Sequence, residues 1–266
     1  MAERARRTGA VGEKPAKPSS IDESEVARFS ALAQEWWNPA GRLSSLHRIN
    51  PLRLAFIRQE ALVNFGREGS ARAPFEGLRL LDLGCGGGLV CEPMRRLGFE
   101  AAGWDASEEI IGIARAHAQE VGLVIPYRKG GVEDVLAEDP APFDVILALE
   151  VIEHVEAPEA FIANCARLIA PGGLFLIATL NRTLRSLALA KIGAEYLLRW
   201  VPAGTHDWRK FLAPAELAAM LEGAGLTVGR SRGLRFDPMR GGWSETGDLS
   251  VNYMIAASRP NGPSKA

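Results

Sequence analysis

The sequence has little cysteine, almost no net charge and no long apolar run. Its three cysteines, Cys85, Cys91 and Cys165, include no CxxC pair, which argues against a disulfide framework or a zinc-finger motif and is typical of reduced cytosolic thiols. The 31 basic and 32 acidic residues nearly cancel, so no overall charge favours binding to nucleic acid. No run approaches about 18 apolar residues and no apolar signal segment opens the chain, so we expect neither a transmembrane span nor a secretory signal.

Both ends of the 266-residue chain are predicted to be disordered tails. Residues 1–20 combine Arg and Lys with Pro and Gly, and residues 261–266 are short and contain little apolar surface. An organelle transit peptide is the alternative for the basic N-terminal tail, but Glu3 and Glu13 argue against it. The hydrophobic content of 47% is enough for one large domain with a full core, which we place at residues 21–260.

The first part of this domain, residues 21–66, is predicted to form a helical cap. The stretch IDESEVARFSALAQEWW, residues 21–37, has an acidic first turn followed by apolar residues at helical spacing. A second helix is predicted from Pro51 to Phe65, with Pro51 in its first turn, where a missing N–H is tolerated.

Beyond residue 74, short apolar strands alternate with helical segments. Five strands are predicted at residues 78–84, 99–105, 125–130, 142–150 and 173–180. Helices are predicted between them at residues 90–97, 108–122 and 158–169. Two more strands are predicted at residues 227–234 and 250–260. This alternation predicts an α/β fold with a doubly wound, mostly parallel sheet.

A glycine-rich loop follows the first predicted strand, in the run LLDLGCGGGLV. Asp82 ends the strand and Gly84, Gly86 and Gly88 follow at every second position, so that the backbone turns tightly and a ligand approaches it closely. The second strand ends in Asp105, whose carboxylate is suited to accept hydrogen bonds from ribose hydroxyls. The loop therefore predicts a nucleoside site. The dinucleotide fingerprint GxGxxG is not met, because position 89 is leucine.

The pattern DxGxGxG instead resembles the S-adenosylmethionine loop of class I methyltransferases. The resemblance implies a Rossmann-like sheet of seven strands, with Asp82 near the ammonium group of the cofactor and Asp105 on its ribose. It also implies that Glu133 or Asp134, in the run GGVEDV, meets the adenine amino group and that Val132 packs on the adenine ring.

Four further runs resemble the ubiquinone biosynthesis O-methyltransferases over roughly residues 20–258. They are HRINPLR (47–53), EVIEHV (150–155), TLNRT (179–183) and GTHDW (204–208). The resemblance implies methylation of a phenolic hydroxyl of a polyprenylated catechol at two steps of that pathway. It implies that Arg53 binds the cofactor carboxylate and that Leu149 lines the cofactor site. The alternatives are a methyltransferase for another phenol or a carbon acceptor, and a non-catalytic scaffold that binds S-adenosylmethionine.

Glu150, Glu153 and His154 follow the fourth predicted strand and are the candidate catalytic residues. Two carboxylates and an imidazole on one side of a helical turn are suited to bind Mg²⁺ or another divalent cation, with open positions for a catechol. His154 could instead act as a general base without metal, or the three residues could form a structural polar turn. The adjacent pair His206 and Asp207 is interpreted as part of a lid.

Residues 181–213 form an insertion that is too long for a simple connection and is predicted to be a helical lid. Its apolar residues recur at helical spacing and are surrounded by Arg and Lys, a pattern typical of helices at membrane interfaces. We therefore expect a cytoplasmic protein peripherally associated with the inner face of an anionic membrane, with other ubiquinone biosynthesis proteins as further partners. The alternative is a lid that packs on its own core.

Overall fold

The computed structural model describes residues 21–188, 208–237, 239 and 242–262. The N-terminal tail, part of the C-terminal tail and most of the predicted lid, including His206 and Asp207, lie outside the described residues. The expectations for these segments are therefore not tested by the fold.

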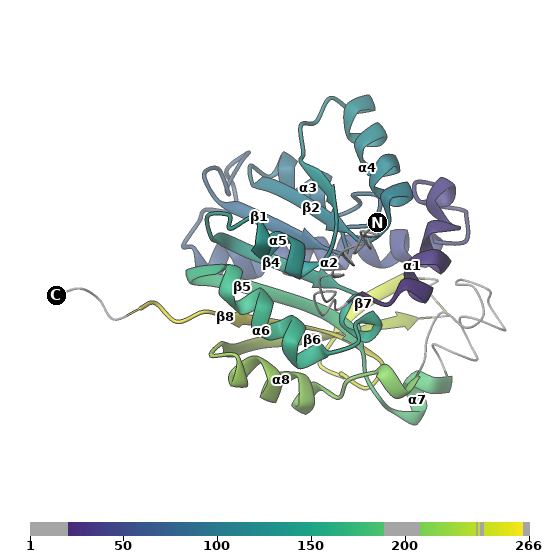
Figure 1. Cartoon of the computed structure of the whole chain (residues 1–266). Coiled ribbons are helices and arrows are strands. Elements are labelled where there is room, and N and C mark those ends of the chain that lie inside the picture. The colour runs from purple at the N-terminus through teal and green to yellow at the C-terminus, as the bar shows by residue number, and fades with distance from the viewer. Residues whose placement is uncertain (1–20, 189–207, 238, 240–241, 263–266) are drawn as a thin grey trace, which may run out of the picture.

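A central sheet has eight strands in the described part of the chain, in the order β3-β2-β1-β4-β5-β8-β6-β7 (Figure 1). The first five strands are parallel, and β8, β6 and β7 join antiparallel. The strands are β1 Arg79–Leu83, β2 Glu100–Asp105, β3 Tyr127–Lys129, β4 Phe143–Leu149, β5 Ile169–Leu180, β6 Thr227–Asp237, β7 Gly242–Thr246 and β8 Asn252–Ser258. The seven predicted strands are all present, and β7 adds an edge strand that pairs only with β6.

Helices cover both faces of the sheet, with α2 and α3 on one face and α5, α6 and α8 on the other (Figure 1). The α-helices are α1 Glu23–Ser30, α2 Ser44–Asn64, α3 Cys91–Arg96, α4 Glu108–Glu120, α5 Val132–Ala137, α6 Pro158–Leu168, α7 Leu184–Ser186 and α8 Pro214–Gly223. Short 3-10 turns are η1 Ala33–Glu35, η2 Ile152–His154 and η4 Trp208–Lys210. Side chains of β4 alternate between the two cores: Val145 and Leu147 pack toward α2 and α3, whereas Ile146 and Ala148 pack toward α5 and α6.

The N-terminal cap differs from its prediction in two places. The first helix ends at Ser30 and continues only as the turn η1, so residues 21–37 are not one helix. The prediction that Pro51 begins the second helix was wrong, because α2 begins at Ser44 and Pro51 lies inside it. Pro51 is exposed, so water can satisfy a carbonyl on that face, while Ile49 and Phe56 bury the opposite side of the helix.

The order of the strands places the carboxyl ends of β1 and β4 side by side. After β1 the chain crosses to β2 and β3 on one side, and after β4 it continues on the other, so the two connections leave a crevice between them. The glycine-rich loop follows β1 and Glu150 follows β4. The fold therefore brings two predicted groups of site residues to one place.

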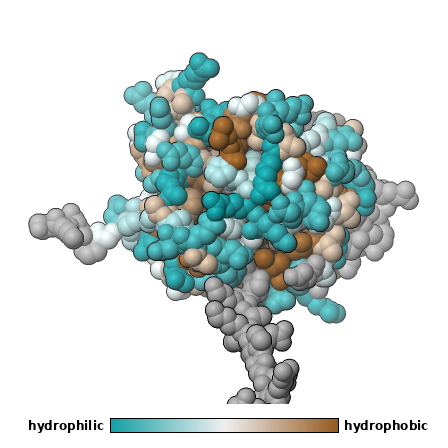
Figure 2. Space-filling view, turned by 45° about the horizontal axis from the view of Figure 1, so that its top comes forward, coloured by the Kyte–Doolittle hydropathy of each residue, from teal (hydrophilic) through white to brown (hydrophobic). Residues whose placement is uncertain are grey.

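The helices of the described residues were compared with the length and hydropathy that a membrane-spanning helix needs. None of the helices in the described residues is long and apolar enough to cross a membrane. On the face shown in Figure 2, apolar side chains gather in small patches separated by hydrophilic ones.

Candidate functional site

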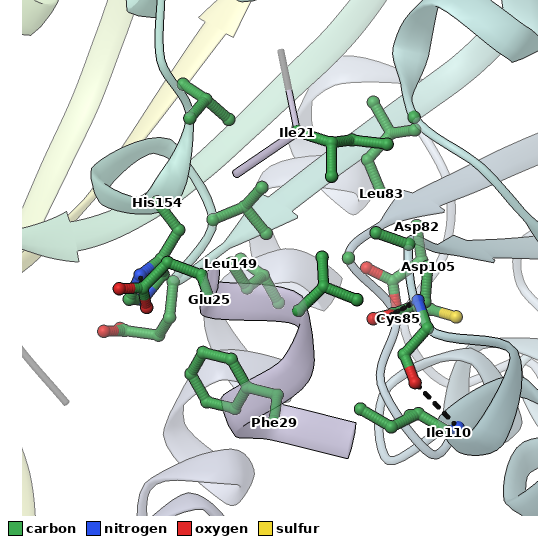
Figure 3. Close-up of a pocket in the computed structure, with 18 of the residues that line it drawn as sticks. Ile21, Glu25, Phe29, Asp82, Leu83, Cys85, Asp105, Ile110, Leu149 and His154 are labelled. Carbon is green, nitrogen blue, oxygen red and sulfur yellow. Dashed lines mark hydrogen bonds and ion pairs between the residues drawn. The ribbon is translucent and has the colours of Figure 1, made fainter. Parts of the chain in front are cut away.

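A cavity lies at this crevice and is lined by residues from several parts of the chain. They come from the cap, the loops after β1, β2 and β3, the segment after β4, and Phe161 of α6. Figure 3 shows Glu25 and His154 together on one side of the cavity, Asp82 and Asp105 on the other, and Leu149 between them. Eight of the predicted site residues line it, namely Arg53, Asp82, Gly84, Asp105, Val132, Leu149, Glu150 and His154.

Asp105 braces the glycine-rich loop with its carboxylate. Oδ2 accepts a hydrogen bond from the Gly86 amide at 3.0 Å, and Oδ1 accepts one from the Ser107 amide at 2.9 Å. Burial raises the pKa of Asp105, and these two hydrogen bonds oppose that increase. Each carboxylate oxygen has a second lone pair, so the group can still accept hydrogen bonds from a ligand.

At two positions of the loop, the backbone conformation and close neighbouring atoms favour glycine over any residue with a Cβ. Gly84 and Gly86 have φ of 68° and 55°, in the left-handed region that favours glycine. A Cβ at Gly86 would lie 1.9 Å from Cζ2 of Trp36, whose ring covers the loop. The structure thus places Gly86 under the cap rather than on the cavity wall, and Gly88 packs against Tyr127 instead.

Polar side chains of the cap bond to the glycine-rich loop and to the cap's own backbone. Asn50 donates from Nδ2 to the Leu89 carbonyl at 2.9 Å, and His47 Nε2 lies 2.8 Å from the carbonyl oxygen of Trp36. Trp37 donates from Nε1 to the Gly87 carbonyl at 3.0 Å. Residues 47, 50 and 53 are spaced three apart along α2, so they lie near one side of the helix.

Asp82 is a buried carboxyl at the end of β1. It is 2% exposed, and its Oδ2 accepts a weak hydrogen bond from Cys91 Sγ at 3.4 Å. Burial raises the pKa of Asp82 to about 7, and the negative charge of Asp105 adds to the increase. A cation brought into the cavity beside Asp82 would favour its charged form.

Arg53 reaches from α2 to Glu150. Nη2 of Arg53 lies 2.5 Å from Oε1 of Glu150, while its buried Nε has no hydrogen-bond partner in the described residues. Glu150 has φ of 55°, an uncommon conformation for a residue other than glycine. Strained backbone conformations of this kind are often found at functional sites. Here the conformation lies at the end of β4 and places Glu150 in the cavity wall.

Glu153 lies beneath the cavity rather than on its wall. It is 2% exposed, and Oε2 accepts a hydrogen bond from Thr179 Oγ1 at 2.8 Å. Its other oxygen, Oε1, is buried and has no partner among the described residues. Burial and the nearby charge of Glu150 raise the pKa of Glu153 well above the ordinary value, which favours a protonated carboxyl.

His154 turns toward the cap. Its Nδ1 lies 3.0 Å from Oε2 of Glu25 on α1, and Phe29, one helical turn further along α1, packs its ring edge-on at a centroid distance of 5.3 Å. Both His154 and Glu25 line the cavity.

The three predicted metal ligands therefore have separate partners. Glu150 is paired with Arg53, Glu153 bonds to Thr179, and His154 bonds to Glu25. Within the described ranges no group of three His, Cys, Asp or Glu side chains is arranged to hold a metal ion. Glu153 and His154 belong to the 3-10 turn η2, which Glu150 precedes, and the carboxyls of Glu150 and Glu153 lie close to each other. The shared ligand set therefore stays a prediction.

The run GGVEDV begins helix α5, with Gly131 as the N-cap residue. Val132 is fully buried and lines the cavity, as a residue that packs on a ligand ring should. Glu133 does not line it: its Oε1 lies 3.4 Å from Nδ2 of Asn164 on α6. Asp134 accepts a hydrogen bond from the Gly131 amide at 2.9 Å and so caps α5.

Sequence reasoning missed Glu25, Trp36, His47 and Asn50. The doublet Trp36–Trp37 and the polar residues of HRINPLR are visible in the sequence, but nothing there shows that they meet the glycine-rich loop. Trp36 also has a buried Nε1 without a hydrogen-bond partner in the structure as described, and it lines the cavity.

Comparisons with known proteins agree with this architecture. A family model described as a methyltransferase domain matches residues 55–230. Magnesium protoporphyrin IX methyltransferase (ChlM) from Synechocystis PCC 6803, solved with bound SAH, has a TM-score of 0.62, 21% identity, and covers 90% of this chain and 100% of that chain. At that identity the likeness concerns the fold. The fold, the glycine-rich loop and the family model define a class I methyltransferase that uses S-adenosylmethionine.

Relatives with higher sequence identity identify the family within this class of methyltransferases. The ubiquinone biosynthesis O-methyltransferase of Caulobacter sp. (strain K31) is 56% identical over 240 residues, which are 90% of this chain and 95% of that protein. The protein of the same name from Mesorhizobium japonicum is 51% identical over 241 residues, 91% of this chain and 96% of that protein. The chain belongs to the ubiquinone biosynthesis O-methyltransferase family.

Proposed function

We propose that this chain transfers the methyl group of S-adenosylmethionine to a phenolic hydroxyl of polyprenylated catechols, at two steps of ubiquinone biosynthesis. One observation carries the proposal: a single cavity joins the carboxyls of Asp82 and Asp105 to the imidazole of His154. The two carboxyls are suited to bind the methyl donor, and the imidazole is suited to accept a proton from an acidic hydroxyl. The name of the relatives supports the class of acceptor.

Each chemical group of S-adenosylmethionine can be matched to residues around the cavity. When bound, S-adenosylmethionine supplies an activated methyl group. Arg53, with a buried Nε that has no partner among the described residues, would hold the carboxylate, and Asp82 would hold the ammonium group. Asp105 would accept hydrogen bonds from the ribose, and Val132 and Leu149 would pack around the nucleoside.

His154 would remove the proton of the acceptor hydroxyl. A free phenol has a pKa near ~10 and is mostly protonated at neutral pH, so methylation needs a base beside the oxygen. With Nδ1 hydrogen-bonded to Glu25, Nε2 is the ring nitrogen that keeps a lone pair. The O–H bond breaks as His154 takes the proton, and the oxygen keeps the electron pair with which it accepts the methyl group.

The binding of the donor should depend on pH through Asp82. The folded carboxyl keeps its proton up to about pH 7, whereas the ordinary pKa of an aspartate side chain is about 3.9, so the stability of the ligand-free protein falls as pH rises between these values. The affinity of Asp82 for the cationic ammonium group has the opposite pH dependence, because only the deprotonated carboxylate is negatively charged. The affinity for S-adenosylmethionine should therefore rise as pH increases from 5.5 to 7.5, approaching tenfold per pH unit below the pKa of Asp82. Calorimetric titration measures this, and Asp82→Asn should flatten the slope. A dissociation constant independent of pH in the unmodified protein would contradict this role.

The acceptor is tested by product analysis. The chain is incubated with S-adenosylmethionine and a short-prenyl catechol, a second phenol without the prenyl group, and a carbon acceptor, and products are identified by mass spectrometry. We expect a monomethyl ether from the prenyl catechol. Methylation of only the other compounds would support a different acceptor class, and binding of S-adenosylmethionine without any product would support a scaffold.

We also propose that the insertion at residues 181–213 contacts an anionic membrane surface. The support is its sequence, since a polyprenyl acceptor resides in the bilayer and the segment combines apolar residues with Arg and Lys. We expect co-sedimentation with anionic liposomes that weakens as salt is raised, and weaker binding to neutral liposomes. Equal recovery in the supernatant with and without anionic liposomes would remove the proposal.

A further inference from the structure

A carboxylate of the cap is bonded to the proposed base, although 129 positions separate the two residues in the sequence. Oε2 of Glu25 lies 3.0 Å from Nδ1 of His154, and the side chains are 15% and 16% exposed. A carboxylate that accepts from one ring nitrogen of histidine fixes which nitrogen carries the proton. Neither the family match nor the motifs of the sequence assign Glu25 a role.

Two further contacts hold the histidine ring against α1. Phe29 lies four residues after Glu25 and meets the ring edge-on, with an angle of 82° between the planes. Ile21 forms an isolated antiparallel bridge with Val155, the residue after His154. The start of the cap is thus attached to the backbone beside the ring, as well as to the ring itself.

The charges around this pair are mixed. Nη1 of Arg28 on α1 lies 3.2 Å from both carboxylate oxygens of Glu25, including Oε2, which faces His154. Lys210 on η4 bonds to Asp22 at 2.9 Å, close to the start of α1. The carboxyls of Glu150 and Glu153 precede His154 on its own segment. The hydrogen bond from His154 is the main cause that lowers the pKa of Glu25, so this carboxyl is charged at neutral pH.

We infer that Glu25 is a positioning residue for methyl transfer: its carboxylate accepts a hydrogen bond from Nδ1 of His154 and so orients the ring in the cavity. This inference rests on the proposed function, in which His154 is the base. The proton moves from the phenol oxygen to Nε2 of His154, and Glu25 keeps its negative charge throughout. Because the carboxylate belongs to α1, the base is complete only when the cap is packed against the segment after β4.

The inference predicts a specific kinetic change in Glu25 variants. Glu25→Ala should lower kcat by about 10- to 100-fold, with little change in the KM for S-adenosylmethionine. Glu25→Gln keeps a hydrogen-bond acceptor but not the charge, so it should lose less activity than Glu25→Ala. Arg28→Gln, which removes the other partner of Glu25, is the matched control and should leave kcat within about threefold.

A double-mutant cycle separates this inference from the proposed function. If Glu25 acts through His154, then Glu25→Ala should cause no further loss of kcat in a His154→Ala background. Equal losses from Glu25→Ala in both backgrounds would overturn the role of Glu25 while leaving His154 as the base. A small effect of His154→Ala itself would instead overturn the base. Thermal unfolding of each variant identifies losses that come only from instability.

Discussion

Replacement of Asp105 by alanine is expected to weaken the binding of S-adenosylmethionine by about 100-fold or more. Hydrogen bonds to a charged group contribute about 1.5–3 kcal/mol each, and the carboxylate is proposed to accept two from the ribose. The change also removes the two hydrogen bonds that hold the amides of Gly86 and Ser107. Calorimetric titration with S-adenosylhomocysteine, which lacks the methyl group, measures the loss without turnover.

A matched control lies at the opposite edge of the sheet, near the start of β4. Asp144 in β4 also uses its carboxylate to accept a backbone hydrogen bond, from the Arg79 amide at 2.8 Å, but it does not line the cavity. Asp144→Asn should therefore keep the dissociation constant within about threefold. If Asp105→Ala bound the ligand as tightly as the control, the assignment of the ribose site would be wrong.

Replacement of His154 by alanine is expected to have the largest effect on turnover. General-base catalysis contributes about 100- to 10,000-fold, so kcat should fall within that range. The dissociation constant for S-adenosylmethionine should stay within about threefold, because the groups proposed to bind the donor lie on other elements. Single-turnover measurements with a short-prenyl catechol separate the chemical step from product release.

His117 provides a comparison for this experiment. It also pairs with a buried carboxylate, with Nδ1 2.6 Å from Oε1 of Glu92, but it does not line the cavity. His117→Gln should keep kcat within about threefold. Unchanged kcat in His154→Ala would return His154 to a structural role in the turn after β4.

The sheet and the cofactor loop were predictable from sequence because both depend on local patterns. Apolar runs of five to eight residues between amphipathic segments specify buried parallel strands. Gly84 and Asp105 are separated by one βαβ-type connection, so their proximity follows from the connection itself. The strand β7 was not predicted because its residues alternate weakly and lie at an exposed edge.

The remaining features of the site depend on contacts between distant segments. The pairs Arg53–Glu150 and Glu25–His154 join the cap to the segment after β4, and no periodicity in either segment marks them. The prediction of a shared metal site assumed that three polar residues in one turn face the same way. In the structure His154 turns to Glu25 on α1, whereas the carboxyls of Glu150 and Glu153 lie close to each other. Pro51 was misplaced because burial of the opposite face of α2 outweighs the cost of an interior proline.

The most direct measurement is methyl transfer from labelled S-adenosylmethionine to a short-prenyl catechol after treatment with EDTA. Because His154 is paired with Glu25 and not with the two carboxyls before it, a protein base is in place for the acceptor proton. We predict a labelled monomethyl ether, formed at the same rate before and after EDTA treatment and after addition of Mg²⁺. Turnover that is lost with EDTA and returns only with metal would contradict the assignment of His154 as the base, and absence of labelled ether under every condition would contradict the proposed function.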